Sequence, residues 1–203
     1  MQEPLSNVSF ERLVDEINHA RAQEYALLAT LLSRSPDTEL IGRMALLRAD
    51  AGPVGAAHAA LGEAARGANE DDLAREYFDL FAGLGDSSLL PYSSHYLAGA
   101  LYGRPLVRLR ESLRHLGIEK VAGHSEPEDH AAILCEIMAG LVSGGFAAAA
   151  GADRDFFERY LAPWIGRFFA DLENAKAARF YARVGSLGRT FVEVEREAFS
   201  LSD

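Results

Sequence analysis

Residues 180–194, FYARVGSLGRTFVEV, give the clearest indication of the fold of this chain. Apolar side chains recur in this stretch in alternating steps of four and three residues: Phe180, Val184, Leu187, Phe191 and Val194. An α-helix turns once in 3.6 residues, so this spacing places them all on one helical face. We therefore predict a long amphipathic helix whose apolar face packs against the rest of the protein.

The same helical periodicity runs through most of the preceding chain. A long first helix is predicted to end near Ser33, a second to begin at Pro36, and a third to cover Val54 to Arg66. The later predicted helices lie around Leu73 to Phe81, Tyr96 to Leu101, Pro105 to Leu116 and Ser125 to Val142, and in an aromatic segment from Asp153 that Pro163 interrupts. Asp153 is expected to cap that segment.

Signals for other architectures are missing from the sequence. No segment shows sustained strand alternation or an Asn-Gly or Asp-Gly hairpin turn, and no fixed-period repeat emerges. The glycines and serines of residues 83–92 indicate a loop. The sequence therefore predicts an all-α fold, a single-domain bundle of about eight to ten helices over residues 1–203, with residues 1–9 as a loose N-terminus.

The charge of the chain restricts its partners. Lys and Arg total 20 against 30 for Asp and Glu, which gives a formal net charge of −10. Such a field repels a phosphate backbone, so nucleic acid is not an expected partner. A cationic peptide would be attracted, although simple solubility is an equally physical reason for an acidic surface.

Cysteine content and apolar runs indicate the compartment. The single cysteine, Cys135, cannot form an internal disulfide and lies in an apolar run typical of a buried thiol. The N-terminus lacks the features of a signal peptide. The longest apolar stretch, Ile133 to Ala152, contains Glu136 and four glycines, so it is too interrupted to cross a bilayer. We predict a cytoplasmic protein without membrane insertion.

Enzyme motifs are also missing from the sequence. There is no P-loop, dinucleotide fingerprint or Gly-x-Ser-x-Gly element, and one cysteine cannot supply a thiolate zinc site. Of the six histidines, only His124 and His130 lie close in sequence to each other and to carboxylates. We therefore predict a binding protein that is not an enzyme, with no catalytic residue, cofactor or metal.

The segment Glu126-Pro127-Glu128-Asp129-His130 is the main candidate for a site. Ser125 with Glu128 forms a capping box, which predicts that a helix begins there, places Glu126 and His130 on one face, and assigns Glu128 to the cap. A di-iron bundle would need Glu-x-x-His on two helices, whereas the spacing here is Glu-x-x-x-His without a second copy.

Two interpretations of the segment remain open on the residues alone. The acids could simply complement the positive end of the helix, each contributing roughly 0.3–1 kcal/mol. Alternatively, they could line the edge of a groove, where carboxylates bind arginine bidentately.

Several segments of the sequence resemble those of a known family. The segment from Glu126 to His130 resembles the Glu-Pro-x-Asp-His signature of the TorD/DmsD family, cytoplasmic chaperones for molybdenum redox enzymes that are related to NarJ-type proteins. Other elements that resemble the family follow in the same order: residues 76–83, the pair Pro91-Tyr92, and the aromatic residues Pro163-Trp164, Phe168, Leu172 and Phe180-Tyr181. The resemblance extends over residues 20 to 197.

The resemblance implies a TorD-like helical fold and a holding function. The partner would be the apo catalytic subunit of a molybdoenzyme, its twin-arginine leader peptide, or both, bound until the cofactor is inserted and before export. By position, an apolar groove would be lined by Tyr77, Leu80, Phe81, Pro91 and Tyr92. Its polar edge would consist of Glu126, Asp129 and His130. Tyr77 and Tyr92 are expected to be partly exposed because each hydroxyl requires a partner.

Alternatives to this function differ in chemical class. A metal- or nucleotide-dependent helical enzyme could use the titratable groups near His130, and an assembly adaptor for a non-exported molybdoenzyme would bind no leader. The neutral Ser93 and Ser94, where the family often has an acidic residue, leave the client undefined. Residues 83–92 and 117–125 are candidate hinges through which two copies could exchange helices as a homodimer.

The binding interpretation makes a mutational prediction. If Asp129 and His130 form a groove edge, replacing either by alanine weakens client binding and leaves thermal stability nearly unchanged.

Overall fold

The computed structural model describes residues 5–82, 89–120 and 126–201. The helices in this part of the chain are α1 (Leu5–Ser33), α2 (Thr38–Met44), α3 (Pro53–Arg66), α4 (Glu70–Tyr77), α5 (Ser93–Ala98), α6 (Arg104–His115), α7 (Ala131–Val142), α8 (Ala152–Phe156), α9 (Ile165–Asn174) and α10 (Phe180–Ser200). One π-helical turn, η1 (Phe78–Ala82), continues α4, and another, η2 (Phe157–Leu161), continues α8. The predicted all-α fold is confirmed, and its only β-feature in the described residues is one isolated bridge.

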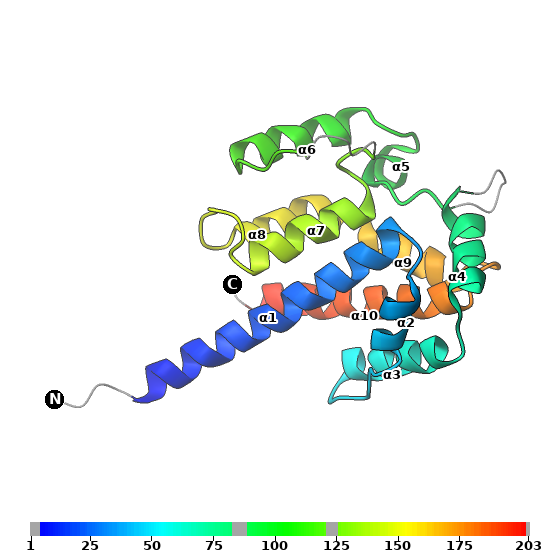
Figure 1. Cartoon of the computed structure of the whole chain (residues 1–203). Helices are drawn as coiled ribbons and strands as arrows, with labels where there is room; N and C mark the ends of the chain where they lie inside the picture. Colours follow the sequence, from blue (N-terminus) through cyan, green and yellow to red (C-terminus); the bar gives the residue numbers. More distant parts are fainter. Residues whose placement is uncertain (1–4, 83–88, 121–125, 202–203) are drawn as a thin grey trace.

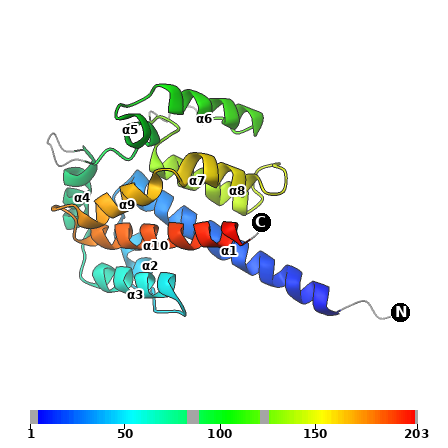
Figure 2. The same cartoon turned by 180° about the vertical axis from the view of Figure 1, so that it is seen from behind.

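Three helix pairings organise the molecule. The 29-residue α1 packs chiefly on α7, and α10 packs on α9 and α3. The N-terminal half of α1 extends away from the other helices, whereas its C-terminal half lies among them (Figures 1 and 2). Segments about 100 residues apart in the sequence, α1 and α7, therefore lie side by side.

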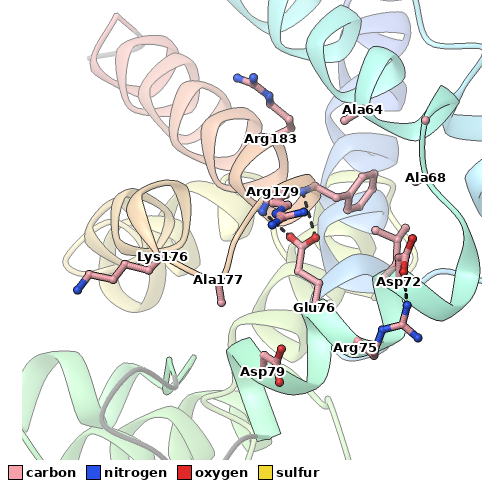
Figure 3. A pocket seen from close by; sticks show the side chains of 13 residues that line it. Ala64, Ala68, Asp72, Arg75, Glu76, Asp79, Lys176, Ala177, Arg179 and Arg183 are labelled. Carbon is pink, nitrogen blue, oxygen red and sulfur yellow. Dashed lines mark hydrogen bonds and ion pairs between the residues drawn. The ribbon is translucent and has the colours of Figure 1, made fainter.

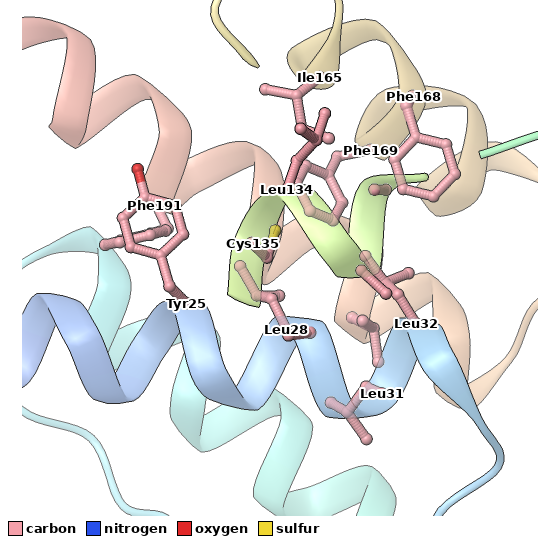
Figure 4. Close-up of a cluster of buried hydrophobic side chains, with 14 of the residues drawn as sticks. Tyr25, Leu28, Leu31, Leu32, Leu134, Cys135, Ile165, Phe168, Phe169 and Phe191 are labelled. Atoms are coloured by element: carbon pink, nitrogen blue, oxygen red, sulfur yellow. The ribbon is translucent and has the colours of Figure 1, made fainter. Parts of the chain in front are cut away.

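The core lies where α1, α7, α9 and α10 meet (Figure 4). The predicted apolar face of α10 is confirmed, because Phe180, Val184, Leu187 and Phe191 are all buried and Val194 is half-buried. A Cβ atom at Gly188 would lie 2.3 Å from the Phe169 ring, so glycine at this position permits the close approach of α9 and α10. Cys135 is buried as predicted, and burial raises its pKa to about 12.

A buried ion pair joins α1 to α10. The Arg21 guanidinium donates from Nε and Nη2 to the two carboxylate oxygens of Glu195, at 2.7 and 2.9 Å. The Tyr25 hydroxyl donates to the same carboxylate at 2.9 Å, and Glu195 is only 2% exposed. Arg21 also contacts Asp153 at 3.1 Å. This network fixes the register of the two helices, since a buried carboxylate needs all of its partners.

Two residues of α4, together with Tyr181 of α10, bind backbone groups at the ends of α10 and α1. The Glu76 carboxylate accepts hydrogen bonds from the backbone N–H groups of Arg179 (2.7 Å), Phe180 (3.2 Å) and Tyr181 (2.7 Å), at the start of α10 (Figure 3). At the end of α1, the hydroxyls of Tyr181 and Tyr77 donate to the carbonyls of residues 31 and 32, each at 3.2 Å. Backbone groups without intrahelical partners are thus satisfied from outside the helix.

Several predicted boundaries differ from the structure. Residues 1–9 were predicted to be loose, but α1 begins at Leu5, and residues 1–4 lie outside the described part. Asp153 does not cap α8, because the cap position is Gly151 and Asp153 instead pairs with Arg21. Pro163 does separate two helical pieces, as predicted, since η2 ends at Leu161 and α9 begins at Ile165. The candidate hinges fall largely on residues 83–88 and 121–125, outside the described residues.

Candidate functional site

Two chain segments that are distant in sequence meet at the candidate site. Tyr92 and His130 form an antiparallel β-bridge. The N–H of Ser93 donates to the carbonyl of Asp129 at 3.0 Å, and the N–H of Ala131 donates to the carbonyl of Pro91 at 2.7 Å. The Pro-Tyr pair and the Glu-Pro-x-Asp-His element, which the sequence treats as separate motifs, therefore form one structural unit.

The buried Asp129 side chain links the two segments of this unit through a hydrogen bond. Its side chain is 1% exposed, and Oδ2 accepts a hydrogen bond from the backbone N–H of Ser94 at 2.9 Å, in the first turn of α5. The carboxylate thus caps α5 from another segment of the chain. Its second oxygen, Oδ1, is buried and has no hydrogen-bond partner among the described residues.

His130 caps the next helix. Its Nδ1 accepts a hydrogen bond from the N–H of Ala132 at 3.1 Å at the start of α7. Burial lowers the pKa of His130, although the nearby carboxylates of Glu126 and Asp129 act in the opposite direction. The neutral ring with an accepting Nδ1 carries its hydrogen on Nε2. That N–H has no partner among the described residues and remains available as a donor.

The helix start predicted at Ser125 is wrong. Helix α7 begins at Ala131, and residues 126–130 run as bends and turns before it, while Ser125 itself lies outside the described residues. Glu126 and His130 therefore do not share a helical face. Glu128 does not cap α7 either, because it accepts from Nε and Nη2 of Arg110 on α6, at 2.9 and 2.8 Å.

A groove runs between α1 and α7 beside this unit, with a volume of about 590 Å³. One wall is a single face of α1 and the other a face of α7. Tyr77, Glu126 and His130 also line it. The lining residues are mostly small: Ala26, Ala29, Thr30 and Ser33 from α1, Arg34 just after it, and Ala132, Ile133, Glu136 and Ala139 from α7. Small side chains on both helices leave room for a ligand segment between them.

Glu126 contributes an exposed carboxylate to this groove. It accepts a hydrogen bond from the hydroxyl of Tyr92, and burial together with this carboxylate raises the pKa of that tyrosine. The Lys120 ammonium contacts the backbone carbonyl of Glu126 at 2.7 Å, not its carboxylate. Within the described residues the Glu126 carboxylate has no cationic partner, so it can accept one from a ligand.

The other predicted site residues divide into two groups. Both Tyr77 and Tyr92 are half-buried, as predicted, but only Tyr77 lines the groove. Leu80 is completely buried in the core, and Phe81 packs against Tyr77 and Tyr181 with ring centroids 4.9 and 5.6 Å apart. Neither Leu80 nor Phe81 lines the groove. Pro91 is buried and acts through its carbonyl on Ala131.

Sequence reasoning missed the groove residues that both helices supply, among them Thr30, Arg34 and Glu136. Glu136 could have been noticed, because it is the only charge between Ala131 and Val142 in an otherwise apolar helix. Thr30 lies on α1 and Arg34 directly after it, both far from α7 in sequence, and no local pattern connects them to α7.

We expect Asp129→Ala to lower stability by about 1–2 kcal/mol, which revises the expectation of unchanged stability. The substitution removes the cap of α5 and leaves the N–H of Ser94 without its acceptor. Thermal and urea unfolding followed by circular dichroism measures the effect, with the exposed Asp79→Ala as the matched control. Wild-type stability combined with lost peptide binding would restore the earlier interpretation of Asp129 as a groove-edge residue.

Comparison with known proteins decides the family. Residues 47–170, more than half of the chain, match the sequence profile of the family described as nitrate reductase delta subunit. The chain belongs to the nitrate reductase delta subunit family. The TorD/DmsD and NarJ resemblance of the Glu126–His130 segment is thereby confirmed at the level of the family.

Other members and a solved structure agree with this assignment. The chaperone protein TorD of Vibrio cholerae (serotype O1) is 30% identical over 134 residues, which cover 62% of this chain and 61% of the relative. The TorD of Shewanella sp. (strain ANA-3) is 25% identical over 90% of this chain and 95% of its own length. A protein described as a redox enzyme maturation protein from Archaeoglobus fulgidus shares the fold, with a TM-score of 0.57 at 24% identity over 84% of this chain and 93% of its own.

Two further properties concern the described residues of this family member. None of its helices has both the length and the apolar character needed to span a bilayer. No group of three or more His, Cys, Asp or Glu side chains there is arranged to bind a metal ion.

Proposed function

We propose that this protein is a cytoplasmic maturation chaperone for a molybdenum redox enzyme and that it is not itself an enzyme. Its groove between α1 and α7 would hold the twin-arginine leader of the apo catalytic subunit until the cofactor has been inserted. The names of its relatives, chaperone and redox enzyme maturation protein, support the class of function. The observation that carries the peptide-binding part is the Glu126 carboxylate, which has no cationic partner among the described residues and lies at a groove with small walls.

The chemistry of the groove is complementary to such a leader, a cationic pair followed by an apolar, helix-prone run. Carboxylates bind arginine through paired, charge-assisted hydrogen bonds, which are stronger than neutral ones. The alanine-rich walls leave space for the apolar run of the peptide. The net charge of −10 attracts a cationic segment from a distance.

His130 supplies a further contact for a bound peptide. Peptides that bind in grooves present backbone carbonyls, and a neutral imidazole with its hydrogen on Nε2 donates to such an acceptor. Because burial disfavours the charged form of His130, this donor adds no positive charge that would repel an arginine. Asp129 contributes by holding the Tyr92 segment against the His130 segment, not by touching the peptide.

We expect Glu126→Gln to weaken the binding of a twin-arginine leader peptide about tenfold, the loss of one charge-assisted contact. Fluorescence anisotropy with a labelled leader peptide measures the change at low salt and at physiological salt. Glu119→Gln is the control, because it removes the same charge from an exposed position that does not line the groove. The loss should be specific to Glu126.

Two outcomes would contradict the proposal in different ways. The wild-type protein could fail to bind the leader peptide and still pull down a molybdoenzyme subunit from the cytoplasm of anaerobically grown cells. In that case the protein is an assembly adaptor that does not recognise the leader. If it binds neither the peptide nor a molybdoenzyme subunit, the chaperone function itself is wrong.

A further inference from the structure

Among the described residues, three charged ones line the groove: Glu126, Glu136 and Arg34. Glu126 lies near Tyr77 and His130, since its carboxylate raises the pKa of the first and opposes the lowering of the pKa of the second. Glu136 lies farther along α7, and Arg34 comes just after the end of α1. None of the three has an ion-pair partner among the described residues. A groove with three uncompensated charges is suited to a ligand that carries charges of its own.

Glu136 is not required by the fold. The buried face of α7 consists of Ala131, Ala132, Leu134, Cys135, Ile137, Met138 and Val142. Glu136 is exposed, accepts no hydrogen bond within the described residues and adds nothing to this apolar face. Its neighbours Ala132, Ile133 and Ala139, at helical spacings of three and four, line the same groove. The Glu136 carboxylate therefore lies in the groove wall that a bound peptide would contact.

The separation of the two carboxylates suits two neighbouring basic residues. A helix rises 1.5 Å per residue, so Glu136 lies roughly 9 Å along the axis of α7 from His130, beside which Glu126 is found. Side chains of adjacent residues in an extended peptide point in opposite directions. Two consecutive arginines, each with a long side chain, can therefore direct one guanidinium to each carboxylate.

We propose that Glu136 is a second cation-binding group of this groove, so that Glu126 and Glu136 together bind two adjacent arginines of one peptide. Arg34 carries the opposite charge in the same groove and weakens the binding of cationic peptides. This inference rests on the proposed leader-binding function and adds to it two residues that determine specificity. The occupant is a peptide with two adjacent basic side chains followed by small or apolar residues.

The test compares variants of the full chain against a matched set of four synthetic peptides. The peptides carry Arg-Arg, Arg-Gln, Gln-Arg or Gln-Gln at the position of the pair. Glu136→Gln should weaken the Arg-Arg peptide about tenfold and leave one of the single-arginine peptides nearly unaffected, because that arginine would bind Glu126. Arg34→Gln should strengthen the Arg-Arg peptide about threefold by removing a like charge.

Matched controls separate local from general charge effects. Glu119→Gln and Arg12→Gln change the total charge by the same amounts at exposed positions outside the groove, and each should leave affinity within about twofold of wild type. Circular dichroism of each variant checks that the fold is retained. Since Glu136 and Arg34 are both exposed, neither substitution removes a buried contact.

The outcomes distinguish this inference from the function on which it rests. If Glu126→Gln weakens the Arg-Arg peptide while Glu136→Gln does not, the second subsite is wrong and leader binding remains. Equal affinity for the Arg-Arg and Gln-Gln peptides would assign the groove to an apolar segment of the client, which overturns the inference. If no peptide binds to the wild-type protein, the leader-binding function itself fails.

Discussion

Replacement of Phe191 by alanine is expected to lower the free energy of unfolding by about 3–5 kcal/mol, the range for truncation of a large aromatic core residue. Phe191 is 4% exposed and lies on α10, where its ring meets the ring of Tyr25 edge-on with centroids 4.8 Å apart. The substitution removes this aromatic contact and leaves a cavity between α1 and α10. Urea unfolding at constant pH, monitored by circular dichroism, measures the change.

The matched control for Phe191 is Phe78→Ala, because Phe78 is 58% exposed on η1. An exposed phenylalanine has little apolar surface to lose, so we expect a change within about 0.5 kcal/mol. Similar losses for the two variants would mean that α10 is not packed on α1 as described.

Glu195→Ala is expected to cost about 3 kcal/mol or more, for an electrostatic reason. The substitution leaves the partly buried guanidinium of Arg21 without its bidentate partner and the hydroxyl of Tyr25 without its acceptor. Removal of one member of a buried ion pair typically costs about 3–5 kcal/mol, because the remaining charge stays desolvated. Asp153 still contacts Arg21, which places the expected loss toward the lower end of that range.

Two comparisons isolate the buried charge. Glu197→Ala removes an exposed carboxylate from the same helix and should change stability by less than about 0.5 kcal/mol. The double variant Arg21→Met with Glu195→Met removes both charges and should recover much of the loss, because apolar residues of similar volume often replace buried ion pairs without cost. A loss in the double variant as large as in Glu195→Ala would show that the charge left behind is not the cause.

Helix positions were predictable from the sequence because they depend on local spacing. The steps of four and three in residues 180–194 place four of the five apolar side chains in the core. Pro163 separates two helical pieces as expected, since proline cannot donate within a helix. These signals act between residues that are near neighbours in the chain, so tertiary contacts reinforce them without changing them.

The start of α7 was not predictable from local signals. Ser125 and Glu128 match a capping box, yet the chain begins its helix at Ala131 and is capped by His130. The reason is tertiary: the N–H of Ala131 donates to the carbonyl of Pro91, and Asp129 accepts from the N–H of Ser94. These hydrogen bonds join segments about 35 to 40 residues apart and hold residues 129–130 out of a helical conformation.

The helical spacing of residues 180–194 and the Glu126–His130 motif thus determined the fold class and the family of this protein from sequence alone. Only the tertiary structure decided the role of each motif residue, because roles depend on burial and on partners far away in the chain. In the tertiary structure Glu126 and His130 line the groove, whereas Leu80 is buried in the core. Asp129 is buried as well and links two chain segments by accepting a hydrogen bond from Ser94. The groove itself arises where α1 and α7 pack together, and no local pattern encodes which face each helix leaves open.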